Sequence, residues 1–472
     1  MDTFLFYDLE TSGRDPRWHR IMQFAGIRTD ANFEPLGSAL RFDVRLDPEV
    51  LPEPEACLIT GLTPQRVASG IDEGQFFRQL AAEFGRPRTC VAGYNNLRFD
   101  DEFVRFGFWR NLRDPYAREW QGRNSRWDLI DLARMAAALR PEGMVWPRVE
   151  GRISFRLEDL AKANAIEQTR AHDATADVEA TLGLARALRR AQPGLFEYHL
   201  SLRSKQRVAE IVGRPLEKPL LHVSPRYGSV TGGVAIVAPI AMHPVNRNAV
   251  ILVDLGCDHE HLLGLDAQTL AESLFLSAAE RGDEPRLPLQ QIALNKLPAV
   301  APIGVLKEAD QARLGIDLEA ALARLEKLRA AVGLMERVRD AYAPRDQGVS
   351  QDVDAALYGG FLPDEDRRIL NELADAPAQD LVHAPALIDQ RCEELLFRQL
   401  ARRHPASLDE SAKARWQAHL QDRLRVGRKG LDSVESARVR LFELQADGAD
   451  LSIIQDLQAW LQHCVDVSGL QA

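Results

Sequence analysis

The 472-residue sequence lacks the cysteine pairs from which disulfide frameworks and zinc sites are built. Its five cysteines are Cys57, Cys90, Cys257, Cys392 and Cys464, and no two of them form a C-x-x-C motif. An odd number of widely spaced cysteines argues against both a disulfide-stapled fold and a structural zinc site.

Long apolar runs and an excess of positive charge are missing as well. No segment approaches the ~18 apolar residues of a membrane span, and the N-terminus shows no basic, signal-like region, so we expect a cytoplasmic protein that does not contact membranes. The net charge is -10 and the pI about 5.7. This acidic balance weighs against a nucleic-acid partner unless a basic cleft is built locally.

The length exceeds that of one ordinary domain, and 45% hydrophobic residues suffice for full cores. Strand-like and helix-like stretches alternate over residues 1–192, which predicts an α/β domain with a mixed sheet. Residues 193–348 are β-rich and interrupted by Gly, Pro and Asn, with one helix late in the region, "ARLEKLRAAVGLMERVRDAY". Residues 349–472 show helical periodicity only, so we predict three domains in a chain that is a monomer by default.

The stretch "FLFYDLETSG" places Asp8 and Glu10 at the end of an apolar run. Side chains at positions i and i+2 of a strand share a face, so both carboxylates point the same way. In a partly desolvated place they repel each other, and either a proton or a cation must supply the missing charge. Mg²⁺ or Mn²⁺ suits oxygen ligands; the alternative is a strand end at which both groups are solvated.

Two later stretches add acidic residues and a histidine. "YNNLRFDDEFV" places Asp100 and Asp101 between a strand and a helix, and "RAHDATADVEA" places His172 before a helix that carries Asp177 in its first turn. The acidic residues of either stretch could instead cap the helix that follows it, and Asp173 or Thr175 is a plausible cap of the second helix. Together with the D-x-E motif, these two stretches give four carboxylates and one histidine within one domain. Such a set is much less probable by chance than any one of the motifs alone.

This set resembles the DEDD superfamily of 3′ to 5′ exonucleases, in its histidine-bearing branch. Longer stretches, among them "GYNNLRFDDE", "SFRLEDLAKAN" and "HPVNRNAVILVDL", are similar to the bacterial exodeoxyribonuclease I family in all three regions. The resemblance implies an RNase H-like exonuclease domain over 1–192, an SH3-like β-barrel domain over 193–348 and an all-α C-terminal domain over 349–472. It also implies an enzyme that degrades single-stranded DNA from the 3′ end to 5′-mononucleotides in DNA repair and recombination.

By the same resemblance Asp8, Glu10, Asp100 and Asp177 hold two Mg²⁺ ions, which Mn²⁺ can replace, and His172 is the general base. Asp100 is preferred to Asp101 because it completes N-x-x-x-D from Asn96. Two ions about 4 Å apart activate the attacking water and stabilise the leaving oxygen. Glu10 and Arg156 are implied to contact the substrate; without the family, Arg156 could equally be a surface residue paired with Glu158 or Asp159.

A path for the strand is predicted in "RFGFWRNLRDPYAREWQGRNSRW", residues 105–127, where arginines alternate with aromatic residues and only Asp114 and Glu119 are acidic. Cations suit the backbone and flat rings suit the bases. This concentration of charge would offset the acidic pI. The predicted contacts are Arg105, Tyr116, Trp120, Arg134 and, from the resemblance, Phe155, whereas Trp109 and Trp127 are expected in the core.

The family also binds the acidic C-terminal tail of single-stranded-DNA-binding protein, and such a tail needs cations around an apolar slot. The aligned candidates are Arg140, Tyr198, Lys218, Lys307 and Arg329, each of which could instead be a solvated surface residue. Two other functions stay open: a related exonuclease that acts on RNA or proofreads for a polymerase, and a non-catalytic module that binds single-stranded DNA.

A pH dependence follows for His172. A neutral imidazole with an unperturbed pKa near ~6.5 can accept a proton, and its protonated form cannot. Turnover should therefore fall as the pH drops through the pKa of His172, and His172→Ala should lower turnover across the whole profile. A variant with wild-type turnover in a steady-state assay would exclude the histidine from this role.

Overall fold

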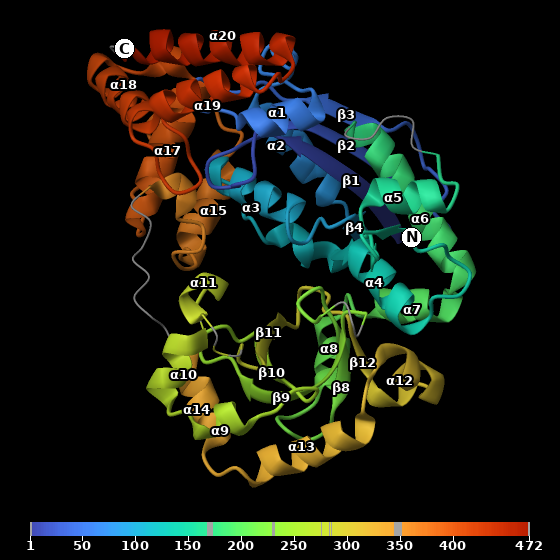
Figure 1. Ribbon diagram of the computed structural model, residues 1–472. Helices are drawn as coiled ribbons and strands as arrows, with labels where there is room; N and C mark the ends of the chain where they lie inside the picture. Colours follow the sequence, from blue (N-terminus) through green and yellow to red (C-terminus); the bar gives the residue numbers. More distant parts are fainter. Residues whose placement is uncertain are drawn as a thin grey trace. The chain divides into compact units, whose positions relative to one another are not determined.

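The computed structural model describes residues 2–167, 173–228, 232–274, 276–282, 284, 286–343 and 352–470 (Figure 1). The chain forms two compact units. The first comprises Met1–Ser125, Gln168–Leu182 and Gly348–Ala472, and the second comprises residues 126–167 and 183–347. In the described part of the chain, no helix is both long and apolar enough to cross a membrane.

The first unit contains the N-terminal strands, blue in Figure 1. Strands β3 (Leu40–Asp43), β2 (Ile21–Thr29), β1 (Thr3–Thr11) and β4 (Thr89–Gly93) are neighbours in that order. β1 runs antiparallel to β2 and parallel to β4. The mixed sheet predicted from the alternation of strands and helices is confirmed.

The two faces of β1 have different surroundings. Leu5, Tyr7 and Leu9 share an apolar core with the phenylalanines of α2 (Glu73–Phe84) and α3 (Asp100–Arg110). The alternate residues Phe4 and Phe6 pack edge-on against Phe33, with ring centroids 5.0 and 5.4 Å away. Because the strand has a period of two, Asp8 and Glu10 continue the row of Phe4 and Phe6.

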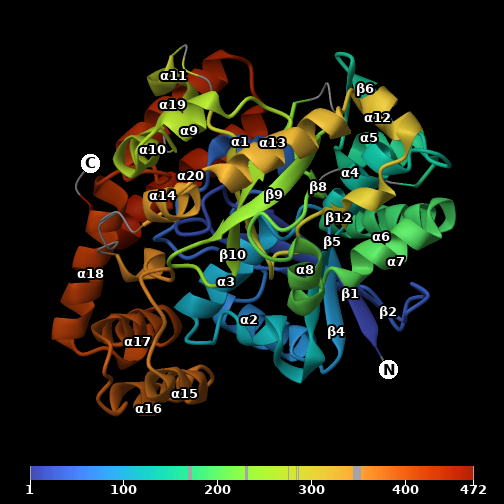
Figure 2. The ribbon, with the colours of Figure 1, turned by 90° about the horizontal axis from the view of Figure 1, so that it is seen from below.

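The C-terminal segment of the first unit is helical, as predicted: residues 352–470 contain no strand. Its helices are α15 (Asp364–Leu373), α16 (Ala378–Val382), α17 (Gln390–Arg403), α18 (Glu410–Arg425), α19 (Val434–Ala446) and α20 (Leu451–Ser468) (Figure 2). Phe106, Trp109 and Leu112 form a common core with Leu370 and Leu395. Trp109 is therefore a core residue, as expected, while α1 (Pro54–Thr60) packs against α19 and α20.

The second unit is organised around an antiparallel sheet in the order β11 (Leu289–Ala293), β10 (Ala249–Asp254), β9 (Val234–Met242), β8 (Leu220–Val223) and β12 (Val300–Pro302). Helices α13 (Leu318–Ala330) and α14 (Leu334–Ala341) pack against β9 (Figure 2). This unit also contains α4 (Leu129–Leu139), β6 (Arg148–Val149), β7 (Arg152–Ile153), α5 (Leu157–Ala163), α7 (Pro193–Ser201), α8 (Lys205–Val212), α9 (Glu260–Gly264), α10 (Ala267–Leu274), α11 (Ala278–Arg281), η4 (Ile303–Val305) and α12 (Glu308–Leu314), and strand β5 (Ser125–Asp128) begins at the last residue of the preceding stretch of the first unit.

Two features of the second unit differ from simple expectation. The helix predicted over "ARLEKLRAAVGLMERVRDAY" is two helices, because Gly333 adopts a φ of 72° that ends the helical path before α14. Met135 and Leu139 of α4 lie in the core of the second unit, although residues 1–192 were expected to form one domain. The boundaries at 192 and 348 stay a prediction, and the compact units divide the chain at other points.

Buried ion pairs join distant segments of the first unit. Asp354 is fully buried and its carboxylate lies 2.6 Å from Arg402, 2.7 Å from Arg423 and 3.2 Å from Arg398. Arg402 also pairs with Glu49 at 2.7 Å. Burial alone would raise the pKa of Asp354, but the arginines outweigh it and hold the pKa well below its usual range.

Removing this carboxylate should therefore destabilise the protein. Asp354→Asn leaves buried guanidinium groups without their counter-charge and should lower the free energy of unfolding by about 3–5 kcal/mol. Denaturant unfolding measures the change. The control is Glu372→Gln, which breaks an exposed pair with Arg368 and should cost less than about 0.5 kcal/mol. Equal effects of the two substitutions would contradict the prediction.

Candidate metal centre and nucleic-acid interface

Three of the predicted carboxylates meet in the first unit. One oxygen from each of Asp8, Glu10 and Asp177 lies within 4.8 Å of the other two. Glu10 is buried, with 8% of its surface exposed, while Asp8 and Asp177 are half-buried. A set of carboxylate oxygens at this spacing suits a hard divalent cation, so the residues fit a metal centre of the kind expected from the sequence.

The start of α6 (Ala174–Ala191) is held by Asp173. Its Oδ1 accepts hydrogen bonds from the backbone N–H groups of Thr175 (3.1 Å) and Ala176 (3.4 Å), so Asp173 and not Thr175 caps the helix. The other oxygen of Asp173 lies 3.2 Å from Arg41. This capping fixes the first turn of α6, where Asp177 lies.

The sheet register explains why Arg41 can reach this region. Asp8 of β1 is opposite Ala25 of β2, and Ala25 is opposite Arg41 of β3. Directly opposite residues share a face of the sheet, so Asp8 and Arg41 lie on the same face. Strand β3 thus places the Arg41 guanidinium on the face of the sheet that carries Asp8.

The carboxylates repel one another strongly. Burial, followed by the charges of Asp100 and Asp177, raises the pKa of Asp8 well above its usual range. Burial, followed by the charges of Asp8, Asp177 and Asp173, raises the pKa of Glu10 to about 9. Without a cation the site therefore retains protons at neutral pH, as the charge argument from the sequence required.

Asp100 and Asp101 have different surroundings. Asp101 is fully buried, and its Oδ1 accepts hydrogen bonds from the hydroxyl of Tyr7 (2.9 Å) and from Arg118 (2.8 Å). Asp100 is also buried, but its charge acts on Asp8. Asp101 is thus part of the internal scaffold. Asp100 is not among the three carboxylates that meet within 4.8 Å, and its place as the fourth carboxylate stays a prediction.

Three more residues are predicted around the reaction: His172, Arg156 and Phe155. His172 is outside the described residues. Arg156 and Phe155 belong to the second unit; the Arg156 side chain is exposed and lies 2.5 Å from Glu158, which is the surface pair that the sequence left open. Phe155 lies under the guanidinium of Arg134 at 5.8 Å, and Arg134 also pairs with Asp131 at 3.0 Å.

The aromatic residues after α3 are divided between surface and core. Trp120 is 64% exposed and follows the short 3₁₀ helix η1 (Ala117–Glu119), before η2 (Gln121–Arg123). Tyr116 is half-buried and packs edge-on against Phe361, which is 87% exposed, with centroids 5.9 Å apart. Trp127 is fully buried in the second unit, as expected for a core residue. The exposed rings suit base stacking.

Contrary to expectation, most arginines of residues 105–127 do not form an exposed row of positive charge. Arg105 is buried and pairs with Glu102 and Glu119, both at 2.8 Å, while its guanidinium lies 5.4 Å from the Tyr116 ring centre. Arg110 and Arg118 are buried in ion pairs. A DNA contact by Arg105 stays a prediction. It is disfavoured because Glu102 and Glu119 already neutralise the guanidinium.

The residues predicted to bind the acidic tail lie in the second unit and several have internal partners. Arg140 pairs with Asp310 at 3.3 Å, and the Tyr198 hydroxyl donates to the Val300 carbonyl at 2.9 Å. Arg329 donates to the Leu216 carbonyl at 2.8 Å. The Lys218 ammonium lies 3.4 Å from the Glu210 carbonyl, and Lys307 precedes α12. Their role stays a prediction.

Sequence reasoning named Asp173 as a candidate cap, which is confirmed, but it missed Arg41 as its partner and Tyr7 as the partner of Asp101. Asp173 carried a signal, since it was one of two candidate caps. Arg41 and Tyr7 carried none, because their partners are 132 and 94 positions away in the chain.

Known families cover nearly the whole chain. The model described as Exonuclease matches residues 5–185, that of the Exonuclease I SH3-like domain residues 203–344, and that of the Exonuclease I C-terminal domain residues 351–464. Exodeoxyribonuclease I of Escherichia coli (strain K12) is 44% identical over 424 residues, 88% of this chain and 89% of its own. That of Haemophilus influenzae is 40% identical over 96% of this chain and 97% of its own.

Solved structures are similar over almost their full length. Exonuclease I from Methylocaldum szegediense matches with a TM-score of 0.93 and 41% identity, covering 98% of this chain and 100% of that chain. E. coli Exonuclease I in complex with a dA16 oligonucleotide matches with a TM-score of 0.92 and 40% identity, covering 99% and 100%. A zinc-bound form of the E. coli ExoI–ssDNA complex matches with the same TM-score, identity and coverage.

The raised pKa of Glu10 predicts how stability depends on pH. In metal-free protein the folded state keeps a proton on Glu10 that the unfolded state releases from about pH 4.5, so stability is lost as the pH rises towards 9. Glu10→Gln removes this loss and should melt at a higher temperature than the wild type at pH 8 in EDTA. Glu179→Gln, on the exposed side of α6, should follow the wild type.

Proposed function

This chain belongs to the exodeoxyribonuclease I family, and from this premise we propose how its own residues carry out the reaction. The enzyme is a hydrolase that degrades single-stranded DNA in the 3′ to 5′ direction. The observation that carries the proposal is the convergence of Asp8, Glu10 and Asp177 within 4.8 Å. Of the alternatives, an RNA nuclease or proofreader has no support in the relatives found, and a non-catalytic module would have no use for these carboxylates.

The enzyme depends on divalent metal ions, which we propose are two Mg²⁺ ions that Mn²⁺ can replace. Asp8, Glu10 and Asp177 would hold them, with Asp100 completing the set. When bound, the ions polarise the attacking water and stabilise the charge of the leaving 3′ oxygen. Since Glu10 has a pKa of about 9, metal binding must release protons, and metal affinity should rise with pH.

The remaining steps fall to side chains of this chain. His172 accepts the proton of the attacking water, and Asp173 holds the helix start that follows it by accepting two backbone hydrogen bonds. Arg156 binds the scissile phosphate through its guanidinium, a role that rests on the family resemblance. Each hydrolysis releases a 5′-mononucleotide.

For the strand, we propose a stacking path that includes Trp120 and Tyr116. The exposure of Trp120 and the edge-on support of Tyr116 by Phe361 favour these rings, and each stacked base is worth roughly 1–3 kcal/mol. Arg134 and Phe155 extend the contacts in the second unit, where they pack on each other.

We further propose a monomeric, cytoplasmic enzyme of DNA repair and recombination that binds the tail of single-stranded-DNA-binding protein. Arg140, Tyr198, Lys218, Lys307 and Arg329 are the candidate contacts. They lie in the second unit, outside the metal centre, so their substitution should weaken tail binding without changing hydrolysis of free DNA.

A defined set of substrates tests the proposed function. With Mg²⁺, a single-stranded DNA oligonucleotide should be shortened from a free 3′ end, and blocking the 3′ end should stop degradation whereas blocking the 5′ end should not. The matching RNA and a blunt duplex should resist. Degradation of RNA at the rate of DNA would overturn the assignment.

Substitution of the metal centre should separate binding from chemistry. Asp177→Asn removes a charged ligand and should lower turnover by at least ~100-fold, with single-stranded DNA still bound in a fluorescence anisotropy assay. Glu179→Gln, two positions along α6 and exposed, is the matched control. Wild-type turnover of Asp177→Asn would remove Asp177 from the centre.

A further inference from the structure

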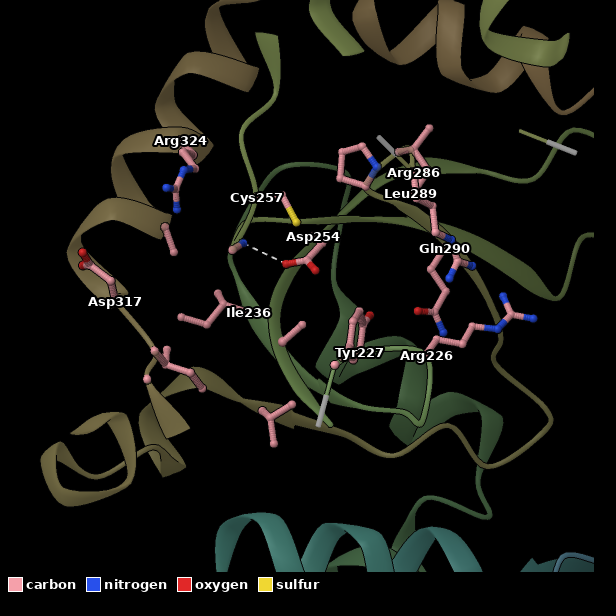
Figure 3. A pocket seen from close by; sticks show the side chains of 18 of the residues that line it. Arg226, Tyr227, Ile236, Asp254, Cys257, Arg286, Leu289, Gln290, Asp317 and Arg324 are labelled. Carbon is pink, nitrogen blue, oxygen red and sulfur yellow. Dashed lines mark hydrogen bonds between the residues drawn. The ribbon is translucent and has the colours of Figure 1, made fainter. Parts of the chain in front are cut away.

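The second unit contains a cavity of about 450 Å³ that the reaction does not use (Figure 3). It is lined by strands β9, β10 and β11 and by the chain around the start of α13. All its lining residues belong to the second unit. Cavities of roughly 300–1,000 Å³ are the size that encloses small organic ligands.

Three arginines contribute to the lining: Arg226, Arg286 and Arg324. Arg226 and Arg286 lie on one side of the cavity beside Gln290, and Arg324 lies on the other (Figure 3). Arg324 donates a hydrogen bond to the Leu255 carbonyl at 3.0 Å. None of the three forms an ion pair with a carboxylate of the described residues, in a chain whose net charge is -10.

The two acidic residues of the lining are engaged locally. Asp254 accepts a hydrogen bond from the backbone N–H of Gly256 at 2.8 Å. Asp317 caps α13 by accepting from the backbone N–H of Ala320 at 2.9 Å. The charge of Arg324 acts on Asp254, whereas Arg226 and Arg286 form no ion pair among the described residues and can receive an anionic ligand.

An apolar wall completes the cavity. It comprises Val234, Ile236, Leu289 and Ile316 together with the ring of Tyr227. The Tyr227 hydroxyl is hydrogen-bonded to Nδ1 of His222 at 2.9 Å, which fixes the ring. A ligand that fills this space needs an anionic group beside Arg226 and Arg286, an apolar face against this wall and polar atoms toward Arg324 on the other side.

We propose that this cavity binds a nucleoside 5′-monophosphate, with the phosphate at Arg226 and Arg286 and the base against the apolar wall. A guanidinium pair holds a phosphate through several charge-assisted hydrogen bonds. Inorganic phosphate would leave the wall unused, and a nucleoside would leave the arginines unused. The ligand belongs to the chemical class of the reaction product, so the cavity would let the enzyme respond to the nucleotides that it releases.

Isothermal titration of thymidine 5′-monophosphate into full-length protein tests this site. The protein carries Asp177→Asn and is kept in EDTA, so that the metal centre contributes nothing and the result does not depend on the proposed function. The double variant Arg226→Ala/Arg286→Ala should lose at least tenfold in affinity. The charge-matched control Arg207→Ala/Arg214→Ala removes two arginines of the same unit that do not line the cavity and should bind as before.

Thymidine and inorganic phosphate, titrated separately, should each bind at least tenfold more weakly than the monophosphate. The proposal is overturned if the monophosphate does not bind, if the two double variants bind it equally, or if inorganic phosphate binds as tightly. It is also overturned if the Arg226/Arg286 variant loses affinity only for a single-stranded oligonucleotide, since the arginines would then serve the polymer.

Discussion

The repulsion between carboxylates at the end of β1 is the constraint on which the functional region depends. Burial and mutual charge raise the pKa of Asp8 and bring that of Glu10 to about 9, so ionising these carboxylates together is costly at neutral pH unless a cation balances them. The fold maintains it by packing the other face of β1 against the phenylalanines of α2 and α3. That apolar core holds β1 in place, and β1 holds the carboxylates close together despite their repulsion. A bound cation would offset this repulsion.

Charge balance in the rest of the first unit is achieved inside the protein. Arg105 and Arg118 are buried against carboxylates, and Arg402 and Arg423 share Asp354. Burying these charges costs desolvation energy, which is offset only if the paired groups meet in a well-defined geometry. The pairs therefore favour one specific arrangement of the segments that they join. The acidic net charge therefore does not exclude an acidic polymer, because the proposed interface would rely on exposed rings and a few cations and not on the overall charge.

Strand and helix periodicity predicted those features of the fold and of the metal centre that depend on residues close together in the sequence. The period of a strand placed Asp8 and Glu10 on one face, and the helix start placed Asp177 near its beginning, so the metal centre could be predicted once three motifs were read together. The mixed sheet and the helical C-terminal segment followed in the same way. What failed had several causes. Gly333 divides a periodic helix from within, Glu102 and Glu119, which lie 3 and 14 positions from Arg105, neutralise that arginine, and Met135 of α4 packs in the core of the second unit. No periodicity records such contacts.

The first unit is assembled from three stretches that are far apart in the chain, the last being residues 348–472. During translation Glu49 leaves the ribosome long before Arg402, and the stretch of residues 348–472 takes on the order of ten seconds to synthesise. Until then a nascent nuclease domain has an unfinished interior in which the Glu49 carboxylate lacks its partner at 2.7 Å. Folding of the first unit is therefore coupled to the synthesis of residues 352–470, since a chain without them cannot form the ion pairs of Arg402 with Glu49 and Asp354.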